Sequence, residues 1–206
     1  MTTSECLQKY RNSVQNIESY ILEAHQQNPA GVYIHTEAYR QFVIAAAVVR
    51  FSIAWEGFLE NISCSYLMGE LDTQGNQVPC CVRARDEKHA SRLLIGTNTY
   101  FDWTNPDKIV QLSTLYFNPD NPIKTGVSSV MSDLKDLKTI RNAAAHISVS
   151  TQGPLNSLAT RLKGSQVTNA IVADVVNYNM SDGRTVWQYF KDLLDAAAES
   201  ISKGQV

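Results

Sequence analysis

The chain has 206 residues, of which 44% are hydrophobic and 18% charged, and its formal net charge is −2. This length suits a single domain, residues 1–206, with a sizeable core, and the composition excludes an intrinsically disordered chain. The small negative charge argues against a protein that coats nucleic acid non-specifically, but a local basic cleft remains compatible with it.

Signals for secretion, membrane insertion and metal binding are weak. The N-terminus lacks the basic-then-apolar pattern of a signal peptide. The longest apolar run, residues 42–49, is too short to span a bilayer and is followed by Arg50. The four cysteines show no C-x-x-C spacing and no histidine at ligand spacing, so we expect no metal site and no cofactor. These features predict a cytoplasmic protein that is not inserted in a membrane, with reduced thiols and with Cys64 in its core.

The first part of the chain favours two long helices. Apolar residues alternating in steps of three and four predict a bundle helix over residues 4–26. These residues are Leu7, Tyr10, Val14, Ile17 and Ile21. Thr36 is a good N-cap for a second helix, residues 36–70, which is apolar on most sides and is expected to be the buried centre of the bundle. Gly57 within it is expected to let a neighbouring helix approach closely.

A loop over residues 72–79 separates this helix from a short one over residues 83–95. Arg85, Lys88 and Arg92 fall on one side of the short helix and are candidates for contacts with RNA phosphates. Because acidic residues are interleaved with them, an ordinary solvated face is the alternative interpretation. The aromatic-rich connection that follows, residues 97–103, either caps the core or offers rings on which bases stack.

The middle of the chain favours three more helices. One begins at Pro106 and ends near Phe117, and an amphipathic helix is expected over residues 127–148. A break over residues 148–154 precedes a short helix, residues 154–163.

Residues 166–176 are rich in β-branched side chains, but an isolated strand would lack a partner, so a helix is preferred there. Asp182 or Thr185 caps the final helix, which ends near Ser202. The predicted fold is an all-α, up-and-down helical bundle with extra short helices and loops.

The end of the 127–148 helix carries the string Arg141-Asn142-Ala143-Ala144-Ala145-His146. Asn142 and His146 are four residues apart and lie on one flank, whereas Arg141 lies at the edge of the apolar stripe. Three successive alanines keep the helix surface low, so that a ligand or another backbone can come close. A cation, an amide and an imidazole in this arrangement suit phosphodiester chemistry, although such sets are also common as structural or solvated groups.

The string RNAAAH resembles the R-N-x-x-x-H signature of the HEPN superfamily, helical proteins that include many metal-independent endoribonucleases. The chain is most similar to the RiboL-PSP-HEPN-like branch. The similarity spans roughly residues 36–148 and a C-terminal helix, and includes Ala54-Trp55-Glu56-Gly57-Phe58 on the preceding long helix.

The resemblance implies that Arg141 clamps the phosphate, Asn142 positions it and His146 acts as general acid or base. It also implies that two copies of the motif form one composite site in a homodimer and leave a 2′,3′-cyclic phosphate. Glu56 is a candidate to orient Arg141 or His146, the alternatives being exposure to solvent or a pair with a neighbouring helix. Some toxins of the superfamily carry a modifiable Tyr where this chain has Ser148, so control through that residue is not implied.

The function expected from these features is RNA cleavage in a toxin or antiviral defence context, with an antitoxin or another defence-system protein as a possible partner. Two alternatives remain open. One is a catalytically inactive HEPN-like module for interaction or ligand binding, and the other is a helical scaffold unrelated to RNA. A hydrolase of another kind is disfavoured, because the sequence has no G-x-S-x-G, no P-loop and no H-E-x-x-H.

Overall fold

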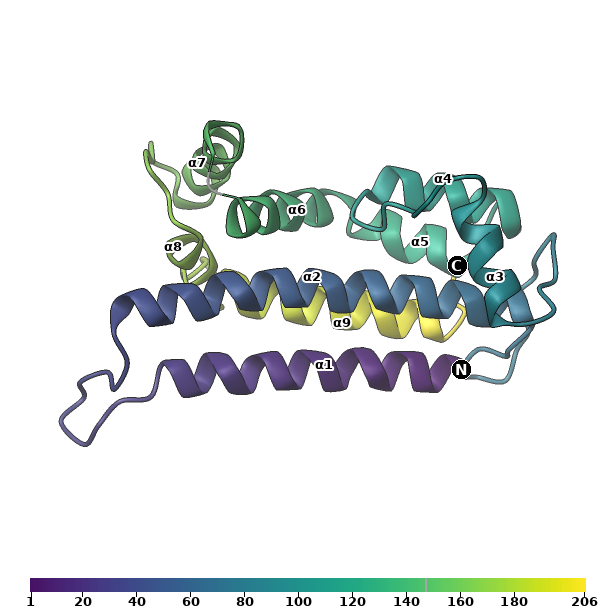
Figure 1. Ribbon diagram of the computed structural model, residues 1–206, viewed down its shortest axis with the longest axis horizontal. Helices are drawn as coiled ribbons and strands as arrows, with labels where there is room; N and C mark the ends of the chain where they lie inside the picture. Colours follow the sequence, from purple (N-terminus) through teal and green to yellow (C-terminus); the bar gives the residue numbers. More distant parts are fainter. Residues whose placement is uncertain (147) are drawn as a thin grey trace. The chain divides into compact units, whose positions relative to one another are not determined.

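All regular secondary structure in the computed structural model, which describes residues 1–146 and 148–206, is helical (Figure 1). The helices are α1 (Thr3–Ala24), α2 (Glu37–Met68), α3 (Glu87–Ile95), α4 (Pro106–Tyr116), α5 (Pro122–Ser129), α6 (Met131–Ala145), α7 (Val149–Lys163), α8 (Val172–Val176) and α9 (Val186–Ser202). Pairing of the β type within these residues is limited to four isolated bridges. The predicted all-α bundle is therefore confirmed.

The chain forms two compact units, each assembled from segments distant in sequence. The first unit comprises Met1–Asn12, Ala54–Lys135 and Leu193–Val206. The second comprises Ser13–Ile53 and Asp136–Asp192. Four helices are divided between the two units, with one part of each in either unit: α1, α2, α6 and α9.

Aromatic side chains form the centre of the first unit. The ring of Tyr10 in α1 lies 6.0 Å from Trp55 and 5.6 Å from Phe58 in α2, measured between centroids. The hydroxyl of Tyr66 in α2 donates to the carbonyl of Ile201 in α9 at 2.5 Å. These contacts place large apolar surfaces out of water and satisfy one of the buried hydroxyls.

A close approach of α5 and α9 in the same unit depends on Gly126. A Cβ at this position would lie 2.4 Å from Cγ1 of Ile201, which is fully buried. Gly57 was the residue expected to permit a close approach, but no atom of a neighbouring described residue lies within 4 Å of its Cβ position. That expectation is wrong, because Gly57 faces open space.

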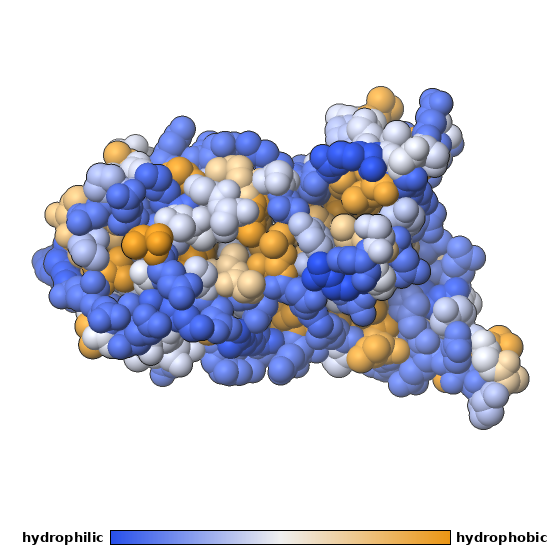
Figure 2. Space-filling model, turned by 180° about the vertical axis from the view of Figure 1, so that it is seen from behind, coloured by the Kyte–Doolittle hydropathy of each residue, from blue (hydrophilic) through white to orange (hydrophobic). Residues whose placement is uncertain are grey.

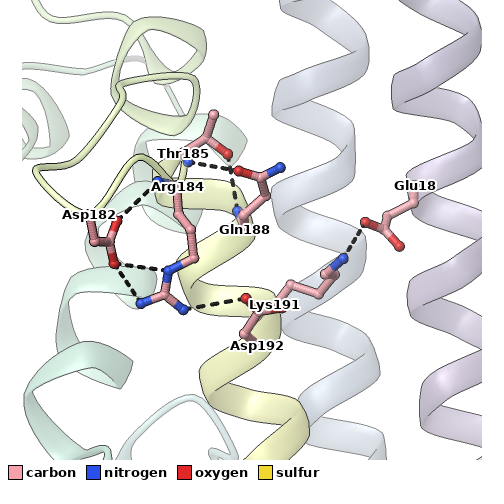
Figure 3. Close-up of polar contacts among 7 residues, drawn as sticks. All are labelled: Glu18, Asp182, Arg184, Thr185, Gln188, Lys191 and Asp192. Carbon is pink, nitrogen blue, oxygen red and sulfur yellow. Dashed lines mark hydrogen bonds and ion pairs between the residues drawn. The ribbon is translucent and has the colours of Figure 1, made fainter.

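In the second unit, packing and charge both link α9 to other helices. Phe51 of α2 contacts Trp187 of α9 with ring centroids 5.1 Å apart. Lys191 of α9 forms an ion pair with Glu18 of α1 at 2.7 Å (Figure 3). The start of α9 is thereby fixed within this unit.

Thr185 rather than Asp182 caps α9. The backbone N–H of Gln188 donates to Oγ1 of Thr185 at 3.2 Å, and the N–H of Thr185 donates to Oε1 of Gln188 at 2.9 Å (Figure 3). This reciprocal pair satisfies two backbone donors at the helix start. Asp182 instead accepts from the guanidinium of Arg184, whose Nη2 lies 2.7 Å from its Oδ2.

The longest helix, α2, is long and apolar enough to cross a membrane, judged by length and composition alone. Only 44% of its most apolar stretch is buried. Tyr39 and Phe42 in its first half are 45% and 70% exposed and Ile53 at its midpoint is 49% exposed, whereas the remainder of its second half is largely buried. The prediction that this helix is the buried centre is thus wrong for its first half. Figure 2 shows one face of the molecule, on which hydrophobic side chains lie exposed between hydrophilic ones.

The helix expected over residues 127–148 is interrupted at Val130, which separates α5 from α6. Val130 has φ −118° and ψ 21°, away from helical values. Just before it, the hydroxyl of Ser129 donates to the carbonyl of Gly126 at 2.8 Å, a local bond that competes with the helical ladder. The last apolar position expected on this stripe, Ile147, lies outside the described residues.

The break expected over residues 148–154 is also misplaced, because α7 already begins at Val149 and contains Pro154. Proline lacks the N–H that would bond the carbonyl of Ser150, four residues earlier. Ser150 is exposed, so that water can bond this carbonyl. Ser148 and Thr151 form a capping box that starts the helix early.

Only part of the ambiguous segment 166–176 is helical, namely α8. The backbone of Ala170 is satisfied by two α7 side chains. Its carbonyl accepts from Gln152 at 2.8 Å and its N–H donates to Asn156 at 2.9 Å. These side chains form the hydrogen bonds that a neighbouring strand would form with this backbone in a sheet.

Two tight loops, after α1 and after α2, share one design. The side-chain oxygens of Asn28 and Asp72 each accept from the backbone N–H groups two and four residues later, at 3.0 Å and 2.8 Å respectively. Three residues later, Gly31 and Gly75 have φ of +76° and +86°. A type I turn followed by a left-handed glycine is a common three-residue hairpin loop.

Candidate functional site

The helix that carries the candidate site, α6, turns an apolar face toward the protein interior. Leu134, Leu137 and Ile140 are at most 6% exposed. Ala143 continues this buried stripe at 8%, whereas Ala144, expected on the stripe, is half-buried. Burial of this face leaves the flank with Arg141 and Asn142 at the boundary between core and solvent.

Arg141 and Asn142 are in direct contact. Nη1 of Arg141 donates to Oδ1 of Asn142 at 3.2 Å, and both side chains are half-buried. Nε of Arg141 is buried and has no hydrogen-bond partner within the described chain. A buried N–H of a cation without an acceptor costs free energy, so this position favours an anionic or strongly accepting ligand.

His146 follows the last residue of α6 and remains tied to the helix. Its backbone N–H donates to the carbonyl of Asn142 at 3.0 Å. Its carbonyl accepts from Oγ1 of Thr151 at 2.6 Å. The imidazole is exposed and makes no hydrogen bond to any residue the structure describes. It is therefore accessible for proton transfer, while both backbone groups of the residue are held.

Thr151 is the positioning residue that sequence reasoning missed. Besides the bond to the His146 carbonyl, its Oγ1 accepts from the N–H of Ser148 at 3.1 Å. The available signal was the spacing of three between Ser148 and Thr151, which resembles a capping box with Thr in place of Glu or Gln.

Glu56 belongs to the first unit, whereas Arg141 and His146 belong to the second. Its side chain is half-buried in α2. Its role in orienting Arg141 or His146 stays a prediction.

The candidate RNA-binding cations Arg85, Lys88 and Arg92 lie in the first unit and are all exposed. The helix begins at Glu87 instead of residue 83, so Arg85 precedes it. Oδ1 of Asp86 accepts from the backbone N–H of His89 at 2.8 Å and thus caps α3. Within the described chain, no carboxylate forms an ion pair with the three cations. They therefore remain available to an external anion.

No group of three or more His, Cys, Asp or Glu residues in the described chain is arranged to hold a metal ion. Cys64 is buried, as predicted, and burial raises the pKa of its thiol to about 12. Cys81 is exposed and Cys80 half-buried.

No protein-family model matches this sequence, and neither a curated protein nor a solved structure matches it. The resemblance to HEPN proteins therefore rests on the sequence pattern alone, chiefly on the motif from Arg141 to His146.

Proposed function

We propose that this protein is a metal-independent endoribonuclease and that Arg141, Asn142 and His146 form its active site. The observation that carries the proposal is the half-buried guanidinium of Arg141, which has a buried Nε without a partner and contacts Asn142 near the exposed His146. In the proposed complex, oxygens of an RNA phosphate accept from this guanidinium.

The proposed reaction is transesterification within the RNA strand. A base removes the proton from a ribose 2′-hydroxyl, and the oxygen attacks the adjacent phosphorus. The bond from phosphorus to the 5′-oxygen breaks as an acid protonates that oxygen, which leaves a 2′,3′-cyclic phosphate and a 5′-hydroxyl. Imidazole suits both proton transfers because its pKa lies near neutrality. Arg141 binds the phosphate oxygens and stabilises the charge that develops on them.

A single chain offers one such imidazole, whereas the reaction needs a base and an acid. A two-fold homodimer brings two copies of the same patch together. The exposed Tyr39, Phe42 and Ile53 of α2 support an interface of this kind, and they belong to the same unit as His146. In the proposed enzyme, the two His146 side chains face one cleft.

The biological setting follows from the resemblance to HEPN proteins. We propose RNA cleavage in the cytoplasm, in a toxin or antiviral defence context, with an antitoxin or another defence-system protein as partner.

The test is cleavage of single-stranded RNA with EDTA present. Wild-type protein is expected to cleave it and to leave cyclic phosphate ends, and His146→Ala is expected to lose most of the activity, about 100-fold or more. Because the imidazole is exposed, this change leaves the melting temperature nearly unaltered. His35→Ala, purified in the same way, controls for contaminating ribonuclease. Equal cleavage by wild type and His146→Ala would overturn the proposal.

A second candidate function is a helical binding module without catalytic activity. The exposed apolar side chains in the first half of α2 favour it, since such surfaces commonly contact other proteins. Intact RNA after incubation with wild-type protein would support this function instead.

A further inference from the structure

A groove in the first unit is formed by the end of α3, the connection over residues 96–102 and α4. Its volume is about 580 Å³. Sites for small ligands span about 300–1,000 Å³, so the groove is large enough for one nucleotide. All the residues that line it belong to this unit.

The aromatic connection divides its rings between the core and this groove. Phe101 packs edge-on against Trp103 with centroids 4.7 Å apart, and Trp103 is only 8% exposed. Tyr100 lines the groove and is 73% exposed, and Leu115 of α4 lines it at 68%. Phe101 thus packs on the buried Trp103 while also lining the groove, and Tyr100 is the largely exposed ring in the lining.

The walls of the groove are tied together and its lining is rich in polar groups. The hydroxyl of Tyr116 in α4 donates to the carbonyl of Leu93 in α3 at 2.6 Å. Asn98 and Gln111 place amides along the groove, and Lys108 adds an exposed cation. Nδ2 of Asn98 donates to the carbonyl of Ile95 at 3.4 Å, which leaves its Oδ1 and the exposed amide of Gln111 to bond the edge of a base.

The exposed basic flank of α3 leads into this groove. Lys88 and Arg92 are four residues apart, and the next steps of three and four reach Ile95 and Gly96, which line the groove. Positions at this spacing lie on one side of a helix. A phosphate chain that follows the two cations is therefore directed to the groove.

We infer that this groove binds an unpaired nucleobase of single-stranded RNA. The base stacks on Tyr100, the amides of Asn98 and Gln111 contact its edge, and Arg92 and Lys88 bind the adjacent phosphates. The inference deepens the proposed function, on which it rests for RNA as the ligand class, and adds a binding site outside the catalytic residues.

The experiment measures binding of a short fluorescein-labelled single-stranded RNA by anisotropy, in the His146→Ala background so that the RNA stays intact. Adding Tyr100→Ala is expected to weaken binding about five- to a hundredfold through loss of stacking, and Tyr100→Phe to retain it. Tyr20→Ala is the matched control, because Tyr20 is 64% exposed but lies on α1. The same RNA carrying 5-iodouridine should photo-crosslink to the tryptic peptide of residues 93–108.

Equal affinity of the Tyr100→Ala and Tyr20→Ala variants, equal binding of duplex RNA, or a crosslink only outside residues 93–108 would overturn the inference. Tyr100-dependent binding by a wild-type protein that cleaves no RNA would refute the proposed catalysis and leave this site standing. Cleavage by a wild-type protein whose affinity for RNA does not depend on Tyr100 would support the proposed catalysis and refute the base-binding groove.

Discussion

At the scale of single residues, the position of Arg141 explains why its chemistry is specific. Its guanidinium is half-buried and holds Asn142, yet its buried Nε lacks a partner in the described chain. A planar guanidinium binds two phosphate oxygens in a fixed geometry, whereas the ammonium of lysine is a point charge.

We therefore expect Arg141→Ala to lower the rate of RNA cleavage about 100-fold or more, and Arg141→Lys to lower it nearly as much. Single-turnover rates with saturating protein separate this effect from weaker binding. Arg161→Lys is the control, since this exposed arginine pairs with Asp136 at the surface. Cleavage by Arg141→Lys at the wild-type rate would show that a positive charge without the guanidinium geometry suffices for catalysis.

The sequence predicts the position of Arg141 on its helix but not the hydrogen bonds that hold the backbone of His146. The period of apolar residues correctly places Arg141 at the boundary of the buried face. The same period does not reveal where the helix ends, because Ser148 and Thr151 begin a new helix, α7, at Val149. Short hydroxyl side chains act through local backbone bonds that leave no periodic signal.

At the scale of helices, two glycines in helical positions have opposite surroundings. Gly126 of α5 lies against the buried Ile201, whereas the Cβ position of Gly57 in α2 faces open space within the described chain. Alanine has the higher helix propensity at both.

Gly126→Ala is expected to lower the free energy of unfolding by about 1–3 kcal/mol, because the new methyl group must displace Ile201 in a packed interior. Gly57→Ala is expected to raise it by about 0.5–1 kcal/mol through helix propensity, because the added methyl group meets open space. Urea denaturation followed by circular dichroism measures both. Stabilisation by Gly126→Ala would mean that α5 and α9 can separate without cost.

Helix boundaries were the least predictable feature at this scale. An uninterrupted apolar stripe favours one helix across Val130, but the hydroxyl bond of Ser129 and the geometry of Val130 divide it. Pro154 favours a break, but an exposed carbonyl four residues earlier makes it tolerable within α7. The first outcome depends on a local hydroxyl bond and the second on the solvent exposure of a carbonyl, and the pattern of apolar residues contains neither.

At the scale of the whole molecule, the proposed composite site makes activity depend on association. The wild-type protein is expected to elute at twice its chain mass of 22.9 kDa at micromolar concentration. Phe42→Glu is expected to shift it to the monomer and to abolish RNA cleavage, because a charge would replace an apolar contact. Size exclusion with light scattering measures the mass.

The control for Phe42→Glu is Leu22→Glu, a change at a residue of α1 that is 71% exposed, close to the 70% of Phe42. A monomeric wild type that cleaves RNA would contradict the dimer.

Acid should destabilise the protein through carboxylates that accept hydrogen bonds in the folded state, among them Glu199 and Asp182. Hydrogen bonds from Lys203 and then Arg11 lower the pKa of Glu199 below its ordinary 4.5, and Arg184 lowers the pKa of Asp182 below 3.8. A pKa that is lower in the folded state means that the unfolded chain binds more protons, so this stability is present above the ordinary pKa and is lost as pH falls.

The melting temperature is thus expected to decline below about pH 4.5 through Glu199 and through Glu5, whose pKa is lowered by hydrogen bonds with Thr2, and then, below about pH 3.8, through Asp182. Glu199→Gln should flatten the upper part of this decline. A decline that begins well above pH 5 in wild type, or that Glu199→Gln leaves unchanged, would assign the acid sensitivity to other groups.

The paired design of the loops after α1 and α2 also has a consequence for how this sequence can diverge. The backbone bends require an Asx side chain at Asn28 and Asp72 and a left-handed residue at Gly31 and Gly75. The two residues between each pair contribute no side-chain bond to the bend. In related sequences, the two inner residues of each loop should therefore vary freely, while the glycine stays three residues after the Asx residue. Two such Asx-x-x-Gly patterns, one after each of the first two helices, should identify these sequences.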